Sequence, residues 1–215
     1  MKSSRIVRLA MFTMAVFGGV KMASADPVYS FTTINVPGAT ATYAFGINAS
    51  GQIVGCFTDT SGKEHGFLDT AGSLTIIDVP RATNTQVYGI NDGGQIVGAF
   101  LNASGFSQGF LDTSGSFTII DVPGAGYSGT GASGINDRGQ IVGTFQDASG
   151  FFQGFLDTAG SFTTIDVPGA SGLGTFARGI NDSGQIVGGS QMRPGSTMAS
   201  WIRLVASPPS MSLGL

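Results

Sequence analysis

One ten-residue phrase occurs four times in this chain and constrains its fold more than any other feature. The phrase Gly-Ile-Asn-x-x-Gly-Gln-Ile-Val-Gly begins at Gly46, Gly89, Gly134 and Gly179, with spacings of 43, 45 and 45 residues. A second phrase, Gly-Phe-Leu-Asp-Thr-x-Gly-Ser, begins at Gly66, Gly109 and Gly154. Self-similarity at a fixed period is typical of folds in which each unit packs only against its neighbours. The chain is therefore predicted to contain about four copies of one structural unit.

Within one unit, the apolar runs are short, rich in β-branched and aromatic residues, and separated by Asn, Asp and Gly. This pattern indicates strands rather than helices. In the first full unit it predicts strands near residues 43–47, 52–58, 65–69 and 74–79. The predicted fold class is therefore all-β.

The segments between these strands carry Asn or Asp three residues before Gly. Asn48 precedes Gly51, Asp59 precedes Gly62, and Asp69 precedes Gly72. An Asn or Asp side chain can bind the backbone two residues on, and Gly accepts the positive φ of a type I turn followed by a G1 bulge. Three such turns in succession predict a four-stranded antiparallel meander.

Both faces of each predicted sheet are apolar, so each sheet must be covered by its neighbours. Units of about 40 to 45 residues with four strands are typical of β-propeller blades. The segment 29–36 resembles a lone fourth strand, and the last unit has strands at 178–188 and 200–204 but no fourth strand. We expect a small propeller of about four blades, closed by the N-terminal strand. A β-solenoid or an open repeat array is the alternative.

The first 25 residues have the pattern of a secretory signal. Lys2, Arg5 and Arg8 precede the apolar run 9–20, which Ala23-Ser24-Ala25 follows as a cleavage site. The run is shorter than the roughly 20 residues of a membrane span. We expect cleavage after Ala25, a β-repeat domain at 26–204, a disordered tail at 205–215, and a secreted, extracellular or periplasmic protein without membrane insertion.

Charge and cysteine content exclude several classes of protein. The signal holds four of the ten basic side chains, which leaves six against thirteen acidic ones. Nucleic-acid binding needs clustered Lys and Arg, and these six are scattered. Cys56 is the only cysteine, and small residues occupy its position in the other units, so we expect it to fill buried space.

The repeated phrases give this chain a resemblance to the HAF family of bacterial extracellular repeat proteins. The family's units carry a Gly-Ile-Asn-Asp-x-Gly-Gln-Ile-Val-Gly core, and its His-Ala-Phe triplet corresponds here to His65-Gly66-Phe67. The resemblance covers almost the whole of the chain after the signal. It implies a location outside the cytoplasm and a β-repeat fold, and it implies no catalytic residue.

No residue pattern in the chain points to catalysis, a metal or a cofactor. Most Asp residues occupy turns, where they are expected as turn formers, and the turns lack the alternating carboxylates of a calcium loop. His65 is the only histidine, and we expect it to be exposed in the turn between the second and third strands. We therefore predict a protein that is not an enzyme.

The repeats differ most between the fourth strand of one unit and the first strand of the next. These connections and the turns between second and third strands are expected to lie at the same end of the fold and to display Arg and aromatic side chains, as recognition loops do. The candidate ligand-binding residues are Arg81, Gln86, Tyr88, Phe106, Tyr127, Phe151, Phe152, Phe176 and Arg178, with Lys63 and His65 beside them.

This surface predicts a binding module for a protein or a cell-surface glycan, with self-association as a further possibility. A structural, self-assembling extracellular matrix-type repeat is the first alternative. A carbohydrate-active enzyme is the second, and it would need a pair of carboxylates outside the turns.

Overall fold

A computed structural model describes residues 30–170, 174–190 and 200–205. The chain divides into two compact units, Met1–Thr33 and Ile34–Leu215, and the second contains all the strands described below. The predicted signal at 1–25, Tyr29 and most of the predicted tail lie outside the described residues. Within the described part, no helix is long and apolar enough to cross a membrane.

The described regular structure consists of antiparallel β-strands, as the sequence predicts. The strands are β1 (Ala41–Ile47), β2 (Ile53–Thr58), β3 (Glu64–Thr70), β4 (Ser73–Ile77), β5 (Asn84–Ile90), β6 (Ile96–Leu101), β7 (Ser107–Thr113), β8 (Ser116–Ile120), β9 (Ala125–Ile135), β10 (Gln140–Asp147), β11 (Phe152–Thr158), β12 (Ser161–Ile165), β13 (Thr175–Ile180), β14 (Gln185–Ser190) and β15 (Ser200–Val205).

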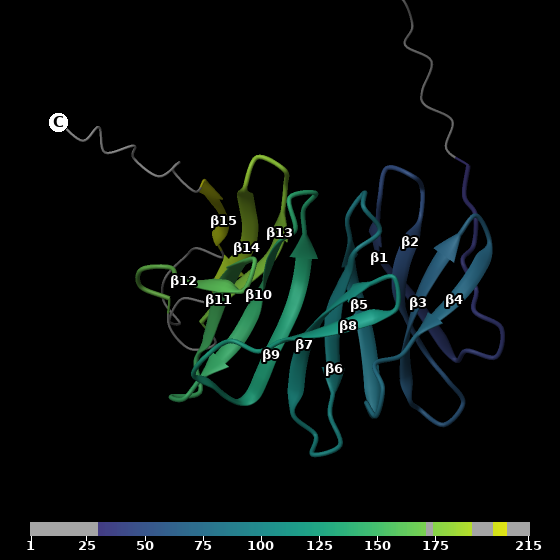
Figure 1. Cartoon of the computed structure of the whole chain (residues 1–215), viewed down its shortest axis with the longest axis horizontal. Helices are drawn as coiled ribbons and strands as arrows, with labels where there is room; N and C mark the ends of the chain where they lie inside the picture. The colour runs from purple at the N-terminus through teal and green to yellow at the C-terminus, as the bar shows by residue number, and fades with distance from the viewer. Residues whose placement is uncertain (1–29, 171–173, 191–199, 206–215) are drawn as a thin grey trace, which may run out of the picture. The chain divides into compact units, whose positions relative to one another are not determined.

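The strands form four sheets that correspond to the four repeats. The first sheet is β1–β4, the second β5–β8, the third β9–β12 and the fourth β13–β15, each a simple antiparallel meander. Figure 1 shows the sheets following one another in chain order. The strands of the first repeat agree with those predicted to within two residues, and β15 confirms the degenerate strand at 200–204.

The tight turns have two different geometries. In the turn between β1 and β2, Gly51 N donates to Asn48 O (3.0 Å), Asn48 Oδ1 accepts from Ser50 N and Gln52 N, and Gly51 has a φ of +76°. This geometry confirms the prediction. The turn between β3 and β4 differs, because Thr70 pairs with Ser73 and both central residues, Ala71 and Gly72, have positive φ. It is a two-residue loop of the type I′ kind, which matches the twist of adjoining strands.

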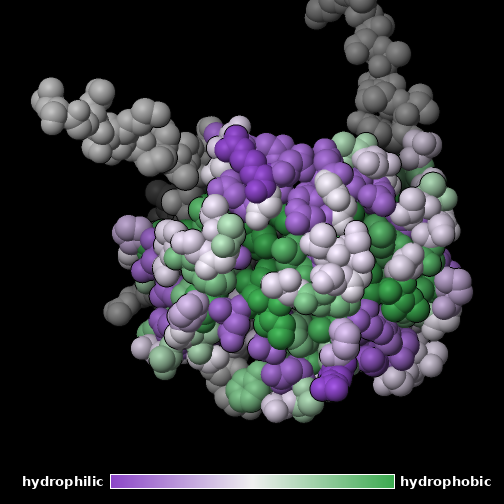
Figure 2. All heavy atoms as spheres, viewed as in Figure 1, coloured by the Kyte–Doolittle hydropathy of each residue, from purple (hydrophilic) through white to green (hydrophobic). Residues whose placement is uncertain are grey.

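The hydrophobic core lies between successive sheets rather than within any one of them. Val54 of the first sheet shares a buried cluster with Ile90 and Phe110 of the second sheet. Val97 of the second sheet packs in the same way with Ile135 and Phe155 of the third. Figure 2 shows hydrophobic side chains gathered in the middle of the visible face, with hydrophilic ones toward the edges where strands end in turns.

The sheets are also joined by hydrogen bonds from an Asn side chain in one repeat to the backbone oxygen of the equivalent Asn in the next repeat. Asn48 Nδ2 donates to Asn91 O (3.2 Å), Asn91 Nδ2 to Asn136 O (3.1 Å), and Asn136 Nδ2 to Asn181 O (3.0 Å). Beside this Asn ladder, Asp92 Oδ1 accepts from Ala49 N of the preceding repeat at 2.7 Å. These residues therefore connect the repeats as well as shaping the turns.

The N-terminal segment differs from the expectation of a strand over residues 29–36. Residues 30–36 have no strand structure, and Ile34 and Val36 pack against Phe57 and Phe67 of the first sheet. Val36 is equivalent to Val79 in the next repeat. Val79 is buried in the cluster between the first and second sheets. The first sheet buries this side chain without any strand pairing. Closure of a ring by pairing of this segment with the fourth sheet therefore stays a prediction.

Candidate functional site

The first strand of each sheet carries a β-bulge immediately before the Gly-Ile-Asn phrase. In β5, Val87 pairs with Gly98 and Gly89 with Val97, so Tyr88 is the extra residue. The equivalent extra residues are Phe45 in β1, Ser133 in β9 and Arg178 in β13. A bulge bends its strand and redirects a side chain, and bulges are frequent beside functional sites. The same bulge thus recurs in all four sheets, and it carries a different side chain in each.

A glycine in the second strand of each sheet makes room for this bulged strand. A Cβ on Gly98 would lie 2.0 Å from the backbone oxygen of Gln86 and 2.8 Å from the Phe110 ring. Gly55, Gly143 and Gly188 stand equally close to the first strands of their own sheets. The glycine of the Ile-Val-Gly phrase is therefore required by the close approach of two backbones.

The four bulge residues line one groove of about 530 Å³. The strands β1, β5, β9 and β13 contribute most of its wall, and Phe152 at the start of β11 adds another ring. The remaining lining residues are Gln86, Ala99, Ser107, Gly129, Thr130, Gly131, Thr144 and Phe176. Because all four sheets contribute, the groove is a property of the assembled repeats and of no single one.

Aromatic rings line the groove at both ends. On β1, Tyr43 and Phe45 lie stacked, with ring centroids 6.2 Å apart and planes 8° apart, and Phe45 contacts Tyr88 on β5 at 5.6 Å. At the other end, the rings of Phe152 and Phe176 lie 5.3 Å apart. The guanidinium carbon of Arg178 lies 5.8 Å from the Phe176 ring centroid, which is a cation–π contact.

A chain of hydrogen bonds fixes the polar groups on β5. The Tyr88 hydroxyl donates to Gln86 Oε1, and Gln86 Nε2 donates to Glu64 Oε2 at 2.9 Å. Burial, with smaller contributions from Cys56 and Glu64, raises the pKa of Tyr88 to about 12. Tyr88 is therefore a neutral hydrogen-bonding group at physiological pH.

The structure brings together five of the nine candidate ligand-binding residues predicted from the sequence. Gln86, Tyr88, Phe152, Phe176 and Arg178 all line the groove. They lie in the strands β5, β11 and β13, which corrects the expectation that these candidates lie in the loops between strands.

The other four candidates do not line this groove. Arg81 lies in the turn after β4 with a φ of +68°, and Phe151 is 47% exposed in the turn between β10 and β11. Phe106 lines a separate hollow of about 510 Å³ with Asn102 and Gln108. Tyr127 lies in β9, with its side chain outside the described set.

Phe45 and Ser133 are the bulge residues that the sequence analysis did not select. Their signal is nevertheless present in the sequence, because the position directly before Gly-Ile-Asn is occupied by Phe, Tyr, Ser and Arg in the four repeats. That variation is recognisable beside a phrase whose neighbouring residues hardly change. Only the bulge shows that this position faces a groove.

His65 is not an exposed turn residue, contrary to expectation. It lies on β3, its side chain only 16% exposed, and its ring stacks on Phe57 with centroids 5.1 Å apart. Its Nδ1 lies 2.8 Å from Asp78 Oδ2, and its Nε2 lies 3.4 Å from Asp59 Oδ2. Chiefly through a hydrogen bond from Ser61, the pKa of Asp59 is lowered to about 2. Through these two contacts, His65 connects Asp59 in the turn between β2 and β3 to Asp78 directly after β4.

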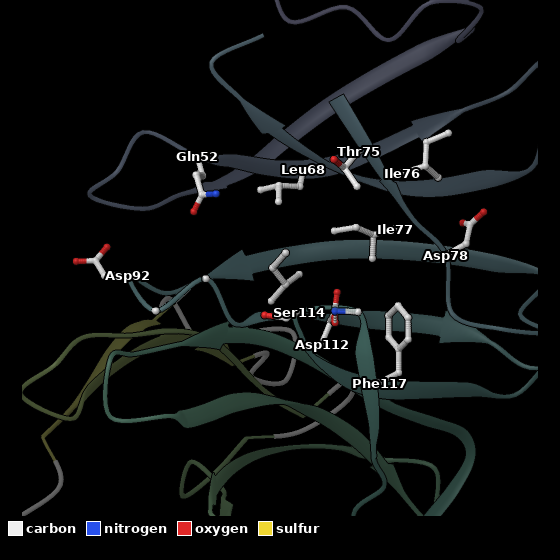
Figure 3. A pocket seen from close by; sticks show the side chains of 14 residues that line it. Gln52, Leu68, Thr75, Ile76, Ile77, Asp78, Asp92, Asp112, Ser114 and Phe117 are labelled. Atoms are coloured by element: carbon white, nitrogen blue, oxygen red, sulfur yellow. Dashed lines mark hydrogen bonds between the residues drawn. The ribbon is translucent and has the colours of Figure 1, made fainter. Parts of the chain in front are cut away.

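A second cavity of about 550 Å³ lies between the first and second sheets. Figure 3 shows Gln52, Leu68 and Thr75 on one side of it and Asp112, Ser114 and Phe117 on the other. Burial raises the pKa of Asp112, whose Oδ1 accepts a hydrogen bond from Gly115 N at 2.7 Å. Most of the lining residues recur at the same positions of other repeats. The stacking of identical units therefore accounts for this cavity, and the groove of variable residues is the better candidate site.

The described residues contain no group of three or more His, Cys, Asp or Glu side chains that could hold a metal ion. The residues that line the groove provide aromatic rings, hydroxyl and amide groups and one guanidinium.

Comparisons with known proteins do not place this chain in a family. No family model matches the chain, and no curated protein matches it. Among solved structures, the chain is similar to a fucose lectin from Kordia zhangzhouensis in complex with methyl-fucoside. The match has 13% sequence identity and a TM-score of 0.37, and it covers 58% of this chain and 96% of that one.

Proposed function

We propose that this protein is a non-enzymatic binding module that holds its ligand in the groove formed by the four bulged strands. One observation carries the proposal. Phe45, Tyr88, Ser133 and Arg178 occupy the same repeat position and line the same groove, yet all four differ. Repetition of one structural unit explains the residues that the repeats share. A surface assembled from their differences is better explained by a ligand with distinct groups along its length.

The chemistry of the groove favours binding over hydrolysis. Glycoside hydrolysis needs two carboxyl groups flanking the scissile bond, and no Asp or Glu is among the residues that line the groove. The only histidine lies between the carboxylates of Asp59 and Asp78 and is not among those residues.

The sequence and the sheet arrangement support a cellular location and a fold type for this proposed binding module. The N-terminal signal pattern and the resemblance to HAF repeats support export and a location in the periplasm or outside the cell. The antiparallel meanders, which pack face to face with the next sheet along the chain, support a propeller-like arrangement of blades. Under this proposal the ligand is a cell-surface glycan or an exported protein.

Alanine variants of the exported protein test the groove. The probe is an array of oligosaccharides from bacterial cell-surface polysaccharides, read by fluorescence of the labelled protein. Tyr88→Ala and Phe176→Ala should each lose at least about 90% of any signal, because each removes a ring from the groove wall. Phe151→Ala is the matched control, since its exposed ring lies outside the groove. Equal losses in all three variants, or loss only in Phe151→Ala, would reject the groove.

A second candidate function, self-assembly into an extracellular array, is favoured by two open sheet faces. Val54, Val97 and Val142 are fully buried against the next sheet, whereas their equivalent Val187 is 51% exposed. Ile90 and Ile135 are buried against the preceding sheet, whereas their equivalent Ile47 is 66% exposed. The faces around Val187 and Ile47 are thus the two halves of an interface that recurs inside the chain.

Light scattering over a range of concentrations tests this second function. If the two faces join between copies, the mass should rise with concentration, and Val187→Asp or Ile47→Asp should return it to that of a monomer. Ile119→Asp is the control, because Ile119 is 55% exposed and lies on neither face. A monomer at every concentration, with the amides around both faces protected from hydrogen exchange, would instead support closure of the ring within one chain.

A further inference from the structure

The groove contains one charged side chain among the residues that line it, Arg178. Arg178 is exposed, and its guanidinium is held over the Phe176 ring. The ion pairs of the described residues all involve His65, so Arg178 has no carboxylate partner there. An arginine oriented by a ring, without an internal counter-ion, is suited to binding an anionic group of a ligand in two parallel hydrogen bonds.

The opposite end of the groove provides a flat apolar surface. Phe45 lines the groove and is 51% exposed, and Tyr43, which is not among the lining residues, lies beside it with an almost parallel ring that is 53% exposed. Two exposed rings in contact form a surface on which a ligand can bury apolar area. The C–H face of a sugar ring is a flat, weakly apolar surface, and it can cover an aromatic ring while the sugar hydroxyls point to the sides.

Neutral polar groups lie between these two ends. Ser133 and Thr144 bring hydroxyl groups from the third sheet, and Tyr88 brings its hydroxyl from the second. Gln86 is already engaged at both ends of its amide, so it holds the Tyr88 hydroxyl in place and leaves the phenolic oxygen as an acceptor. Hydroxyl and phenol groups exchange hydrogen bonds readily with sugar hydroxyls.

Size and charge limit the ligand further. A volume of about 530 Å³ lies within the range of roughly 300 to 1,000 Å³ for small-molecule sites. A nucleic acid would present several phosphates to a single cation, and its affinity depends on neutralising many of them. One cation, a pair of stacked rings and neutral hydrogen-bonding groups fit a short saccharide with one carboxylate near Arg178.

From these observations we infer that the groove binds an acidic glycan, with a sugar carboxylate on Arg178 and a sugar ring on Tyr43 and Phe45. The inference rests on the proposed binding function and specifies its ligand class. Glu64 is not among the lining residues, but its negative charge acts on Tyr88, which is a further reason to place the sugar carboxylate on Arg178 and not beside Tyr88.

The test compares a glucuronate-containing tetrasaccharide with its carboxyl-reduced counterpart, by calorimetry on the exported protein at low salt. The acidic sugar should bind about tenfold more tightly, because only its carboxylate can form charge-assisted hydrogen bonds with the Arg178 guanidinium. Arg178→Gln should abolish this preference while the weaker binding of the reduced sugar persists. Arg138→Gln is the matched control, because Arg138 lies in the turn between β9 and β10 and is not a lining residue.

The outcomes separate the ligand class from the function. Equal affinity for both sugars, unchanged in Arg178→Gln but lost in Tyr88→Ala, would overturn the acidic class and leave the binding function intact. A peptide with a free C-terminal carboxylate that binds through Arg178, while neither sugar binds, would overturn the glycan class. If no probe in the calorimetry or the array depends on Tyr88, both the ligand class and the proposed function fail. Circular dichroism of each variant confirms that the fold is retained.

Discussion

Asn91 Nδ2 donates a hydrogen bond to the backbone oxygen of Asn136, 3.1 Å away in the next repeat. The same amide group donates to Gln95 Oε1 (2.9 Å), while Asn91 Oδ1 accepts from Gln95 N (2.9 Å). Asn91 is almost completely buried. One side chain thus closes its own turn and connects two sheets, which explains why this Asn recurs in every repeat.

Loss of this connection should destabilise the fold. Asn91→Ala leaves several buried backbone and side-chain groups without partners, and we expect it to lower the free energy of unfolding by about 1–3 kcal/mol. Asn181→Ala is the control, because Asn181 forms the same turn bonds but is exposed and has no described bond to a further repeat. Urea denaturation of both variants measures the difference. Equal losses would mean that the bond between repeats contributes nothing.

Substitution of Gly98, the glycine beside the β5 bulge, should destabilise the fold. Gly98→Ala places a methyl group 2.0 Å from Gln86 O, so β5 must move away or the bulge must be lost. We expect a loss of at least about 1–3 kcal/mol, as for other overpacked sites, together with weaker ligand binding because Tyr88 is displaced.

Gly189→Ala provides the control for Gly98. A Cβ at Gly189 would meet nothing within 4 Å, and the equivalent residue of the second repeat is Ala99. Thermal unfolding should therefore be nearly unchanged. A Gly98→Ala variant as stable as Gly189→Ala would contradict the close approach of the two strands.

Cys56 should be unreactive in the folded protein. It is buried on β2, and burial, aided by the negative charge of Glu64, raises the pKa of its thiol to about 11. Because the thiolate is the reactive form, alkylation by iodoacetamide at neutral pH should be slow in the native protein and fast in denaturant. Native labelling at the rate of a free small-molecule thiol would contradict this, and would also argue against the space-filling role predicted from the sequence.

Tyr88 should make stability depend on pH in the alkaline range. Its folded pKa of about 12 lies above the ordinary tyrosine value of 10.0, so the folded state retains the phenol proton more strongly than the unfolded state does. This contribution is fully present below pH 10 and is lost as the pH rises through about 12. Unfolding experiments at increasing pH should show a smaller alkaline loss in Tyr88→Phe. An identical loss in both proteins would show that Tyr88 titrates normally.

Much of this fold can be predicted from the sequence because each repeat contains short motifs that specify its strands and turns. The phrase beginning at Gly46, the Asn48 turn and the short β-branched runs set the strands, their order and their antiparallel pairing. Each of these features depends on residues a few positions apart, so hydrogen bonding within a hairpin suffices to specify it. The N-terminal segment is the exception to these strand predictions, because Val36 is buried against the first sheet without forming a strand.

The groove is only partly predictable from the sequence. Gln86, Tyr88 and Arg178 were recognisable as variable polar and aromatic residues, but they were assigned to loops. Nothing in a single repeat indicates that Phe45 and Ser133, 88 residues apart in the sequence, line one groove.

The repeat, the all-β class and the positions of the tight turns follow from the sequence alone, because they depend on backbone preferences and short-range hydrogen bonds. The positions of the variable residues relative to one another depend on the packing of the sheets. Gly98 lets β5 approach so closely that its bulge turns Tyr88 into the groove, and stacking of the sheets places Arg178 along the same groove. Tyr88 and Arg178 thus reach the same groove through packing between residues far apart in the chain, and short sequence motifs do not predict such packing.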